Sequence, residues 1–335
     1  MIDVTHPVKP KITVTREVFQ EVLDLLAEHF DVTHNQADEP CSADYLVAQL
    51  ADKAGVLTTM TDRVDDALLA RCPNLKAVCN IAVGHNNIDL AACTRRGVMA
   101  TNTPGVLDAT TADFAFALML AAARRVTEAE ASLRAGEWQR WKLKQFLGVD
   151  VNGATLGIIG MGRIGQAVAR RARGFDMRVI YHNRQPLAAE TEAACNAIYM
   201  GMTDLLKQAD FVVLLVPYSP ETHHLIGAEA LSRMKKSGIL INIARGGVVD
   251  DRALIAALKD GTIAAAGLDV FENEPKLNQG FLTLKNVVLT PHIASSSAAT
   301  RKRMAMTAAD NLIAALTGKR PPNLLNPEVL NVASG

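Results

Sequence analysis

The stretch Thr155-Leu-Gly-Ile-Ile-Gly-Met-Gly-Arg-Ile-Gly-Gln-Ala-Val-Ala-Arg-Arg171 decides the fold of this chain. An apolar, strand-like segment leads through a G-x-G-x-x-G loop into a helical pattern, as in a βαβ unit that binds a dinucleotide. In such a loop Gly160 makes the tight turn, Gly162 lets the backbone approach a pyrophosphate, and Gly165 lets the helix pack on the strand. The free N–H groups of the helix N-terminus would bind the phosphates.

Outward from this loop, short apolar runs alternate with amphipathic stretches along most of the chain. This alternation predicts βαβ units and an α/β fold with parallel sheets. Continuous apolar runs such as Phe211–Val216 predict strands that are buried on both faces, as doubly wound sheets require. The other predicted strands are Ile12–Val14, Gly55–Thr58, Lys76–Ile81, Thr155–Ile159, Arg178–Tyr181, Ile239–Ile243, Ala265–Leu268 and Val287–Leu289. The predicted helices between them include Arg16–His29, Ser42–Asp52, Ile164–Gly174 and Arg252–Lys259.

The alternation stops between Thr101 and Val151, which predicts a domain boundary. Residues 112–125 and 128–135 read as helices, and 136–153 reads as a loop. We therefore predict two doubly wound parallel-sheet domains. A flavodoxin-like substrate domain would comprise residues 1–102 with 291–335, closed by a helix at 297–317. A Rossmann-type cofactor domain with the connecting and dimerisation helices would comprise 103–290.

The composition excludes several classes of partner. The 35 Lys and Arg residues balance 35 Asp and Glu residues, so no global basic field would recruit nucleic acid or an anionic membrane. Met1–Arg16 is polar and resembles no secretory signal, so we expect a cytoplasmic protein. The five cysteines form no C-x-x-C pair and suggest buried or incidental thiols. The pair His223-His224 has no metal-ligand spacing, and we predict no metal site.

Three polar residues stand at the ends of apolar runs in the second half of the chain. Arg245 follows Ile-Leu-Ile-Asn-Ile-Ala, Glu274 lies shortly after the strand ending at Leu268, and His292 follows Val-Val-Leu-Thr-Pro. Ligands of open α/β sheets bind outside the carboxyl ends of the strands, so the three side chains are expected in one site.

These residue types suit the reduction of a 2-oxo acid. Arg245 offers a permanent forked cation for the substrate carboxylate. His292 can donate a proton to the ketone oxygen as hydride arrives. A carboxylate beside the imidazole would stabilise its charged form and orient it, a role assigned to Glu274. Glu272 is an alternative partner for His292.

The segment after the strand that ends at Tyr181 predicts the choice of cofactor. An NAD site usually has Asp or Glu here to bind the ribose 2′-OH, whereas this chain has Asn183 and Arg184. The absent carboxylate and the added cation favour NADP(H), with NAD(H) still usable. The alternative is that Arg184 is a solvated loop residue.

Four motifs together resemble the D-isomer-specific 2-hydroxyacid dehydrogenase family. They are Gly160-Met-Gly-Arg-Ile-Gly165, Asn242-Ile-Ala-Arg-Gly-Gly-Val-Val-Asp250, Gly267-Leu-Asp-Val-Phe-Glu-Asn-Glu-Pro275 and Thr290-Pro-His-Ile293. Likeness extends over about Lys11 to Pro327, and is greatest to glyoxylate/hydroxypyruvate reductases and 2-ketogluconate reductases. The narrower likeness is carried by Asn80-Ile-Ala-Val-Gly84, Asn102-Thr-Pro-Gly105, Gly136-Glu-Trp138 and Glu221-Thr-His-His-Leu225. A departure is His85-Asn86, where many relatives have Tyr-Asp.

The resemblance implies that Arg245, Glu274 and His292 are catalytic and that the chain forms a homodimer. It implies that the backbone at Val83 and Gly84 binds the substrate carboxylate, and that Trp141 of one subunit enters its neighbour's substrate pocket. Trp141 could instead anchor its own loop. The predicted cofactor-binding residues are Gly160, Gly162, Arg163, Ile164, Gly165, Asn183, Arg184, Val216, Pro217, Thr222, Ala244 and Asp269.

The leading functional hypothesis is therefore reduction of glyoxylate, hydroxypyruvate or 2-ketogluconate to the D-2-hydroxy acid. A phosphoglycerate- or phosphite-type dehydrogenase on the same scaffold is an alternative, although no cation adjoins Val83-Gly84 to meet a dianion. A corepressor-like protein that senses NAD(H) without turnover is another. Formate dehydrogenases generally pair their histidine with glutamine, so Glu274 argues against that reaction.

Overall fold

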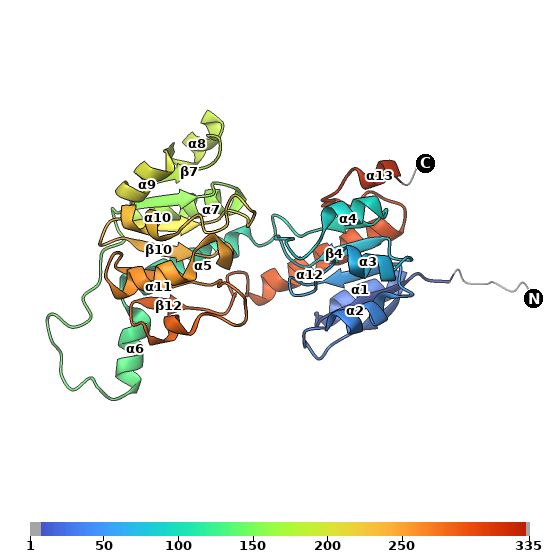
Figure 1. Cartoon of the computed structure of the whole chain (residues 1–335), viewed down its shortest axis with the longest axis horizontal. Coiled ribbons are helices and arrows are strands. Elements are labelled where there is room, and N and C mark those ends of the chain that lie inside the picture. Colours follow the sequence, from blue (N-terminus) through green and yellow to red (C-terminus); the bar gives the residue numbers. More distant parts are fainter. Residues whose placement is uncertain (1–7, 333–335) are drawn as a thin grey trace, which may run out of the picture. The chain divides into compact units, whose positions relative to one another are not determined.

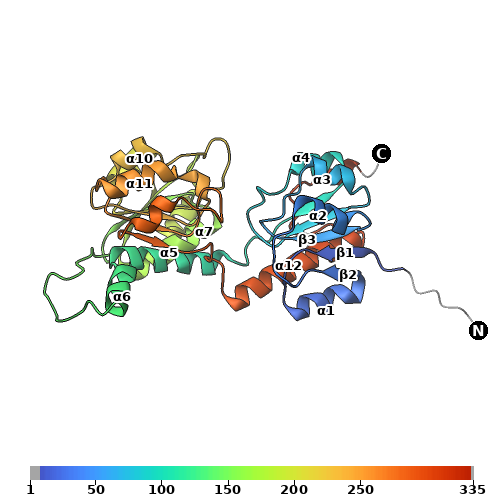
Figure 2. The same ribbon diagram turned by 60° about the horizontal axis from the view of Figure 1, so that its bottom comes forward.

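The computed structural model describes residues 8–332, and these residues form two compact units (Figures 1 and 2). The first unit contains residues 8–107 and 297–332, and the second contains 108–296. Each unit is built on a fully parallel sheet, so the prediction of two parallel-sheet α/β domains is confirmed.

The sheet of the first unit has five strands in the order β2-β1-β3-β4-β5. This order is that of flavodoxin-like folds. Helices α1 and α12 cover one face of the sheet, and α2, α3 and α4 cover the other. The strands are β1 (Lys11–Val14), β2 (Asp31–His34), β3 (Gly55–Thr58), β4 (Ala77–Asn80) and β5 (Met99–Thr101). The helices are α1 (Gln20–His29), α2 (Ala43–Leu50), α3 (Asp66–Arg71), α4 (Leu90–Arg95), α12 (Ala298–Leu316) and α13 (Val329–Val332).

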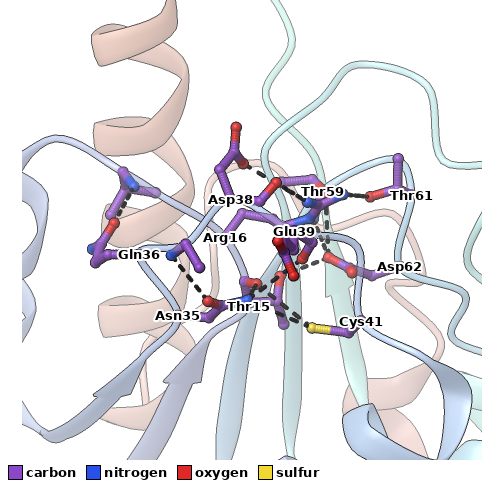
Figure 3. A network of polar contacts seen from close by, with 12 residues as sticks. Thr15, Arg16, Asn35, Gln36, Asp38, Glu39, Cys41, Thr59, Thr61 and Asp62 are labelled. Atoms are coloured by element: carbon purple, nitrogen blue, oxygen red, sulfur yellow. Dashed lines mark hydrogen bonds and ion pairs between the residues drawn. The ribbon is translucent and has the colours of Figure 1, made fainter.

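A polar network joins the loops that follow β1, β2 and β3 in this unit (Figure 3). Thr15 Oγ1 donates to Asp62 Oδ2 at 2.6 Å, and the two guanidinium ends of Arg16 donate to the Asp38 carbonyl and the Thr61 hydroxyl at 2.6 and 2.7 Å. Thr15, Arg16 and Asp62 are buried. Since buried polar groups are costly when unpaired, the network stabilises one arrangement of the loops at this edge of the sheet.

The sheet of the second unit has seven strands in the order β12-β11-β10-β9-β6-β7-β8. Helices α5 and α7 pack on one face, and α9, α10 and α11 pack on the other. The strands are β6 (Thr155–Ile159), β7 (Arg178–His182), β8 (Ala197–Tyr199), β9 (Phe211–Leu214), β10 (Ile239–Asn242), β11 (Ala265–Leu268) and β12 (Val287–Leu289). The helices are α5 (Asp108–Ala123), α6 (Val126–Arg134), α7 (Arg163–Ala172), α8 (Ala189–Cys195), α9 (Met202–Gln208), α10 (Ala228–Arg233) and α11 (Asp251–Lys259).

The unit bounds differ by a few residues from the predicted domain bounds. Residues 291–296, including His292, belong to the second unit, whereas the predicted bound at 291 placed them in the first. The reason is local, because the backbone N–H groups of His292, Ile293 and Ala294 all donate to Asp269 just beyond β11. These bonds tie the loop to the second sheet.

Helix α6 and the loop after it extend away from the rest of the second unit (Figures 1 and 2). Helix α6 has no buried residue, and the loop carries several exposed apolar side chains. The largest of these are Trp138 and Trp141, the latter 73% exposed. Monomeric proteins rarely expose large apolar side chains in such a group, so this arm has the character of an interaction surface.

The five cysteines are free thiols, as the sequence suggests. Burial raises the pKa of Cys79 and of Cys93 to about 12, so both remain protonated and unreactive at neutral pH. Among residues 8–332, no helix is both long and apolar enough to cross a membrane.

Candidate active site

The glycine loop follows β6, where the chain leaves the middle of the second sheet. A side chain at Gly160 would collide with the backbone of Leu215 and Val216, and Gly160 also has a φ of +103°. A Cβ at Gly165 would lie 2.5 Å from the Gly160 carbonyl oxygen. No atom lies within 4 Å of a Cβ position at Gly162, so that surface is open.

This geometry fits the pyrophosphate of a dinucleotide. Gly162 is the N-cap of α7, and a ligand there would meet the unpaired N–H groups and the positive end of the helix dipole. Arg163 and Ile164 form the first turn of α7. The loop stands at the switch point between β6 and β9, where such sheets bind their ligands.

Asn183, just beyond β7, contacts the glycine loop directly. Its Oδ1 accepts a hydrogen bond of 2.7 Å from the Met161 N–H, and the Gly160 N–H donates to the His182 carbonyl at 3.0 Å. With Oδ1 occupied, the amide Nδ2 is the group that Asn183 could offer to a ligand.

Arg184 lies near the turn that follows β9. A hydrogen bond from Ser219 lowers the pKa of Glu221, and the positive charge of Arg184 contributes to the same shift. Thr222 closes this turn, because its Oγ1 donates to the Pro217 carbonyl at 2.8 Å and accepts from the Ser219 N–H at 2.8 Å. The turn therefore brings an acidic side chain into the electrostatic range of Arg184.

The three predicted catalytic residues follow three adjacent strands. Strands β10, β11 and β12 are neighbours in the sheet, and Arg245, Glu274 and His292 follow them in that order. Parallel strands end at the same edge, so the three side chains meet at the carboxyl edge of the sheet that also carries the glycine loop.

Glu274 and His292 form a direct pair. Glu274 Oε2 lies 2.7 Å from His292 Nδ1, and the His292 and Glu274 side chains are 23% and 31% exposed. Burial by itself raises the pKa of Glu274, but the hydrogen bond and charge of His292, with the Phe271 N–H and Arg245, bring it below its ordinary value. An ionised Glu274 accepts the Nδ1 proton and leaves Nε2 as the imidazole nitrogen available to a substrate.

Glu272, the alternative partner of His292, bonds elsewhere. Its Oε1 lies 2.5 Å from His224 Nε2. The structure thus pairs each carboxylate with a different histidine, and Glu274 is the partner of His292.

His292 is held in an unusual backbone conformation. Its φ is +54°, in the left-handed region that L residues seldom occupy. Its N–H donates to the Asp269 carbonyl at 2.9 Å. Both carboxylate oxygens of Asp269 accept from the same loop, at 2.7 Å from Thr290 Oγ1 and 2.8 Å from the Ile293 and Ala294 N–H groups. Strain of this kind persists where the surroundings fix the backbone, as at functional sites.

Asp269 is fully buried, and burial raises its pKa while these hydrogen bonds oppose the rise. Its two oxygens organise the His292 loop. Contact of Asp269 with the cofactor stays a prediction.

Arg245 is held by the turn that follows β10. Its Nη1 donates to the Ala244 carbonyl at 2.7 Å, and Asn242 binds the turn through the Ala244 N–H and the Arg245 carbonyl. Burial lowers the pKa of Arg245, and the negative charge of Glu274 opposes that change. A guanidinium remains charged even so, which leaves a cation for an anionic ligand.

The remaining predicted residues occupy separate places. Val216 and Pro217 follow β9 in the second unit. Val83 and Gly84 follow β4 in the first unit, where Asn102 Nδ2 donates to the Val83 carbonyl and Asn80 Nδ2 to the Gly84 carbonyl, at 2.8 and 2.9 Å. Their carbonyls are thus engaged, and their N–H groups are what could meet an anion. The predicted contacts of these residues with substrate or cofactor are still predictions.

The sequence did not indicate which residues pair with the turn Phe271–Glu274, which follows β11. His224 lies in a turn, and its ring pairs with Glu272, whose N–H donates to buried Asp251 at 3.3 Å. These contacts join residues 48 and 21 positions apart. The spacing of the residues contains no signal for such pairs, which arise from loop geometry. No group of three or more His, Cys, Asp or Glu side chains within 8–332 could hold a metal ion.

Comparison with known proteins identifies the family of this chain. Residues 116–294 match the model of the D-isomer specific 2-hydroxyacid dehydrogenase NAD-binding domain. A glyoxylate reductase of Thermococcus gammatolerans is 48% identical over 328 residues, covering 97% of this chain and 98% of that protein. Another, of Aeropyrum pernix, is 48% identical over 329 residues, covering 97% of this chain and 98% of the relative.

Solved structures give the same result. An NADPH-dependent glyoxylate/hydroxypyruvate reductase from Sinorhizobium meliloti, in complex with NADP and malonate, has a TM-score of 0.85 and 34% identity, with 96% of this chain and 98% of that chain covered. The matched residues 116–294 include the Gly160–Gly165 loop and the Arg245, Glu274 and His292 cluster at neighbouring strand ends. On this combined evidence the chain is an NAD(P)-dependent oxidoreductase that belongs to the D-isomer specific 2-hydroxyacid dehydrogenase family.

Proposed function

We propose that the protein reduces glyoxylate to glycolate, and also reduces hydroxypyruvate and 2-ketogluconate to the corresponding D-2-hydroxy acids. The observation that carries the proposal is the 2.7 Å pair of Glu274 and His292 beside the half-buried Arg245. The relatives named as glyoxylate reductases and the structure solved with malonate support the choice of a small carboxylate-bearing substrate.

In this proposal Arg245 binds the substrate carboxylate with two parallel hydrogen bonds. A bound reduced nicotinamide cofactor supplies the hydride to the carbonyl carbon. His292 Nε2 donates its proton to the carbonyl oxygen, which has gained the electron pair of the carbonyl π bond, so a hydroxyl group forms. Glu274 stabilises the charged imidazole before this transfer and keeps its orientation.

We further propose that NADPH is the preferred cofactor and that NADH is also used. Arg184 offers a cation to the 2′-phosphate. The Met161 N–H is bound to Asn183 Oδ1, so the group that Asn183 offers to the phosphate is its Nδ2 donor. Support comes from the relative that was solved with NADP. Glu221 near Arg184 opposes an anionic ligand, which keeps the expected preference moderate.

We also propose a homodimer in which the exposed arm of α6 and its following loop is covered by a second subunit. Trp141 is 73% exposed, and its burial against a partner would remove a large apolar surface from water. In the dimer Trp141 would enter the partner's substrate pocket.

The experiment is a steady-state assay of the purified protein with NADPH or NADH, followed at the absorbance of the reduced nicotinamide. The reduced cofactor is supplied with glyoxylate, hydroxypyruvate, 2-ketogluconate or 3-phosphohydroxypyruvate. The oxidised cofactor is supplied with phosphite, and the rates are compared. Sustained reduction of glyoxylate supports the proposal. Faster turnover of a phosphorylated acid or of phosphite would favour the phosphoglycerate- or phosphite-type alternative. Cofactor binding without turnover of any substrate would favour the NAD(H)-sensing alternative.

A further inference from the structure

A second carboxylate–histidine pair lies in the loops beside the catalytic pair. His224 Nε2 and Glu272 Oε1 are 2.5 Å apart, and the side chain of Glu272 is 25% exposed. Neither residue has a role in the proposed proton transfer. A bond to a partly buried carboxylate is stronger than an exposed ion pair, so this pair can fix the position of a loop.

Glu272 is joined to the rest of the site through its backbone. Its N–H donates to the buried carboxylate of Asp251 at 3.3 Å. The neighbouring carbonyl group of Phe271 packs so closely on Gly246 that a Cβ there would lie 1.9 Å from it. Gly246 directly follows Arg245, so the turn that bears Arg245 and the turn that bears Glu272 are in contact.

The same turn also holds Glu274. The Phe271 N–H donates to Glu274 Oε1 at 2.8 Å, while Glu274 Oε2 binds His292. The backbone from Phe271 to Glu274 is therefore held by His224 through the Glu272 side chain and by Asp251 through the Glu272 N–H. The last residue of this turn is Glu274, whose carboxylate orients His292.

We propose that His224 is a positioning residue: through Glu272 it holds the Phe271–Glu274 turn so that Glu274 stays aligned on His292. This inference rests on the proposed function, since it assigns a purpose to an alignment that matters for proton donation. Small misplacements of a catalytic group reduce turnover more than they reduce binding.

His224 itself is anchored from the opposite side. Its N–H donates to the Gly247 carbonyl at 2.8 Å, and its φ is +51°. Asparagine tolerates this left-handed conformation best among the non-glycine residues. His224→Asn therefore removes the reach to Glu272 with little backbone cost. His224→Gln instead offers an amide N–H near the place of Nε2 and can restore the bond.

The matched control is His223→Gln. His223 stacks on His224 with ring centroids 3.8 Å apart, but it bonds Tyr218 rather than Glu272. His223 is thus a histidine in the same turn that makes no bond to Glu272. Thermal unfolding of each variant shows whether it is folded.

For His224→Asn and for Glu272→Gln we expect kcat with glyoxylate to fall about tenfold, with little change in the affinity for NADPH. His224→Gln should recover most of the rate, and His223→Gln should match the wild type. In a Glu274→Gln background, His224→Asn should have little further effect, because the route through Glu274 is already broken. Equal losses in both backgrounds, or a His224→Asn protein within twofold of wild-type kcat, would overturn the proposal.

A spectroscopic measurement separates this proposal from the proposed function. The downfield proton signal of His292 Nδ1–H, assigned by its loss in His292→Gln, reports the bond to Glu274 without any substrate. It should shift or broaden in His224→Asn and stay in place in His223→Gln. A wild type without glyoxylate turnover would contradict the proposed function, and an unmoved signal in His224→Asn would contradict the positioning role.

Discussion

Glu274 Oε2 lies 2.7 Å from His292 Nδ1, although the two residues follow different strands and are 18 positions apart. The contact depends on the backbone of His292, whose positive φ is held by hydrogen bonds to Asp269. The pair therefore needs both the order of the strands and a strained loop. This explains how a solvent-accessible imidazole is kept in one orientation.

The first prediction concerns proton donation by this pair. His292→Ala should lower kcat for glyoxylate by about two to four orders of magnitude, because the general acid is lost. In Glu274→Gln the charged imidazole is less stabilised, so activity should be lost at the high-pH side of the profile while the low-pH side persists. The measurement is kcat against pH for both variants. Wild-type turnover by His292→Ala would refute the assignment.

The second prediction concerns Arg245. Arg245→Lys should raise KM and lower kcat for glyoxylate, together by about a hundredfold in kcat/KM, because a lysine cannot form the forked contact. Burial lowers the pKa of Arg245 and would also lower the pKa of a lysine at this position. Because the ordinary pKa of lysine is below that of arginine, the lysine would lose its charge at a lower pH. The loss should therefore grow as pH rises. Binding of NADPH, followed by fluorescence, should hardly change, and normal KM and kcat would make Arg245 a loop cation.

The third prediction concerns stability and pH at Asp251. This side chain is 4% exposed, and burial, with the negative charge of Glu272, raises its pKa from 3.8 to about 6. The folded state then holds a proton that the unfolded state releases between pH 4 and 6. The contribution of Asp251 to stability is thus present below pH 4 and lost as pH rises through 6.

Asp251→Asn keeps an oxygen acceptor for the Glu272 N–H but never ionises. Relative to wild type, its free energy of unfolding should rise between pH 4 and pH 7 by an amount on the order of 2–3 kcal/mol. Urea titrations at several pH values measure this difference. Asp260→Asn, exposed at the end of the same helix, is the control and should show no comparable trend. A difference for Asp251→Asn that does not change with pH would contradict the prediction.

The sequence predicted the inner strands and the edge strand β12, but it missed three other strands at sheet edges. Strands β3, β6, β11 and β12 have the predicted bounds, and the other predicted strands differ by one or two residues at their ends. The strands β2, β5 and β8 lie at sheet edges. An edge strand is covered by only one neighbour, so it need not be a continuous apolar run, and the segment Asp31–His34 has none of its residues buried.

The site was predictable where chemistry and strand ends coincide, as at Arg245 and His292. The choice between Glu272 and Glu274 was not predictable, since both follow the same strand and differ only in how the turn folds. The bond of Asn183 to the Met161 N–H was also missed. The sequence does not distinguish an asparagine that binds the backbone of a loop from one that binds a ligand.

The fourth prediction tests Trp141 and the proposed dimer together. If Trp141 serves the partner's pocket, Trp141→Ala and His292→Ala proteins should both be poorly active alone. After the subunits are mixed and exchanged, each mixed dimer contains one site with its own His292 and the partner's Trp141, so activity should reappear. Trp138→Ala, whose indole is also exposed, is the control variant and should keep its activity. An unchanged rate after mixing, with exchange verified by mass, would rule out a shared site.

The last prediction concerns cofactor choice. Arg184 can pair with the 2′-phosphate of NADPH, and Asn183 can donate a hydrogen bond through Nδ2 while Oδ1 holds the Met161 N–H. Charge-assisted bonds of this kind contribute about 1.5–3 kcal/mol, which corresponds to a roughly ten- to hundredfold preference in kcat/KM. Because Glu221 lies in the electrostatic range of Arg184, Glu221→Gln should increase the preference for NADPH.

Asn183→Asp combined with Arg184→Ala should reverse the preference. The aspartate retains an oxygen for the Met161 N–H, so the glycine loop should keep its shape, while the new carboxylate accepts the 2′-OH of NADH and repels the phosphate of NADPH. The measurement is kcat/KM for both cofactors at saturating glyoxylate, in the wild type and in these variants. Turnover with NADH should stay near the wild-type value, since Arg245, Glu274 and His292 are unchanged. A wild type that favours NADH would show that the Arg184 cation does not meet the ribose, and the loss of both activities in the double variant would show that Asn183 is needed for the glycine loop itself.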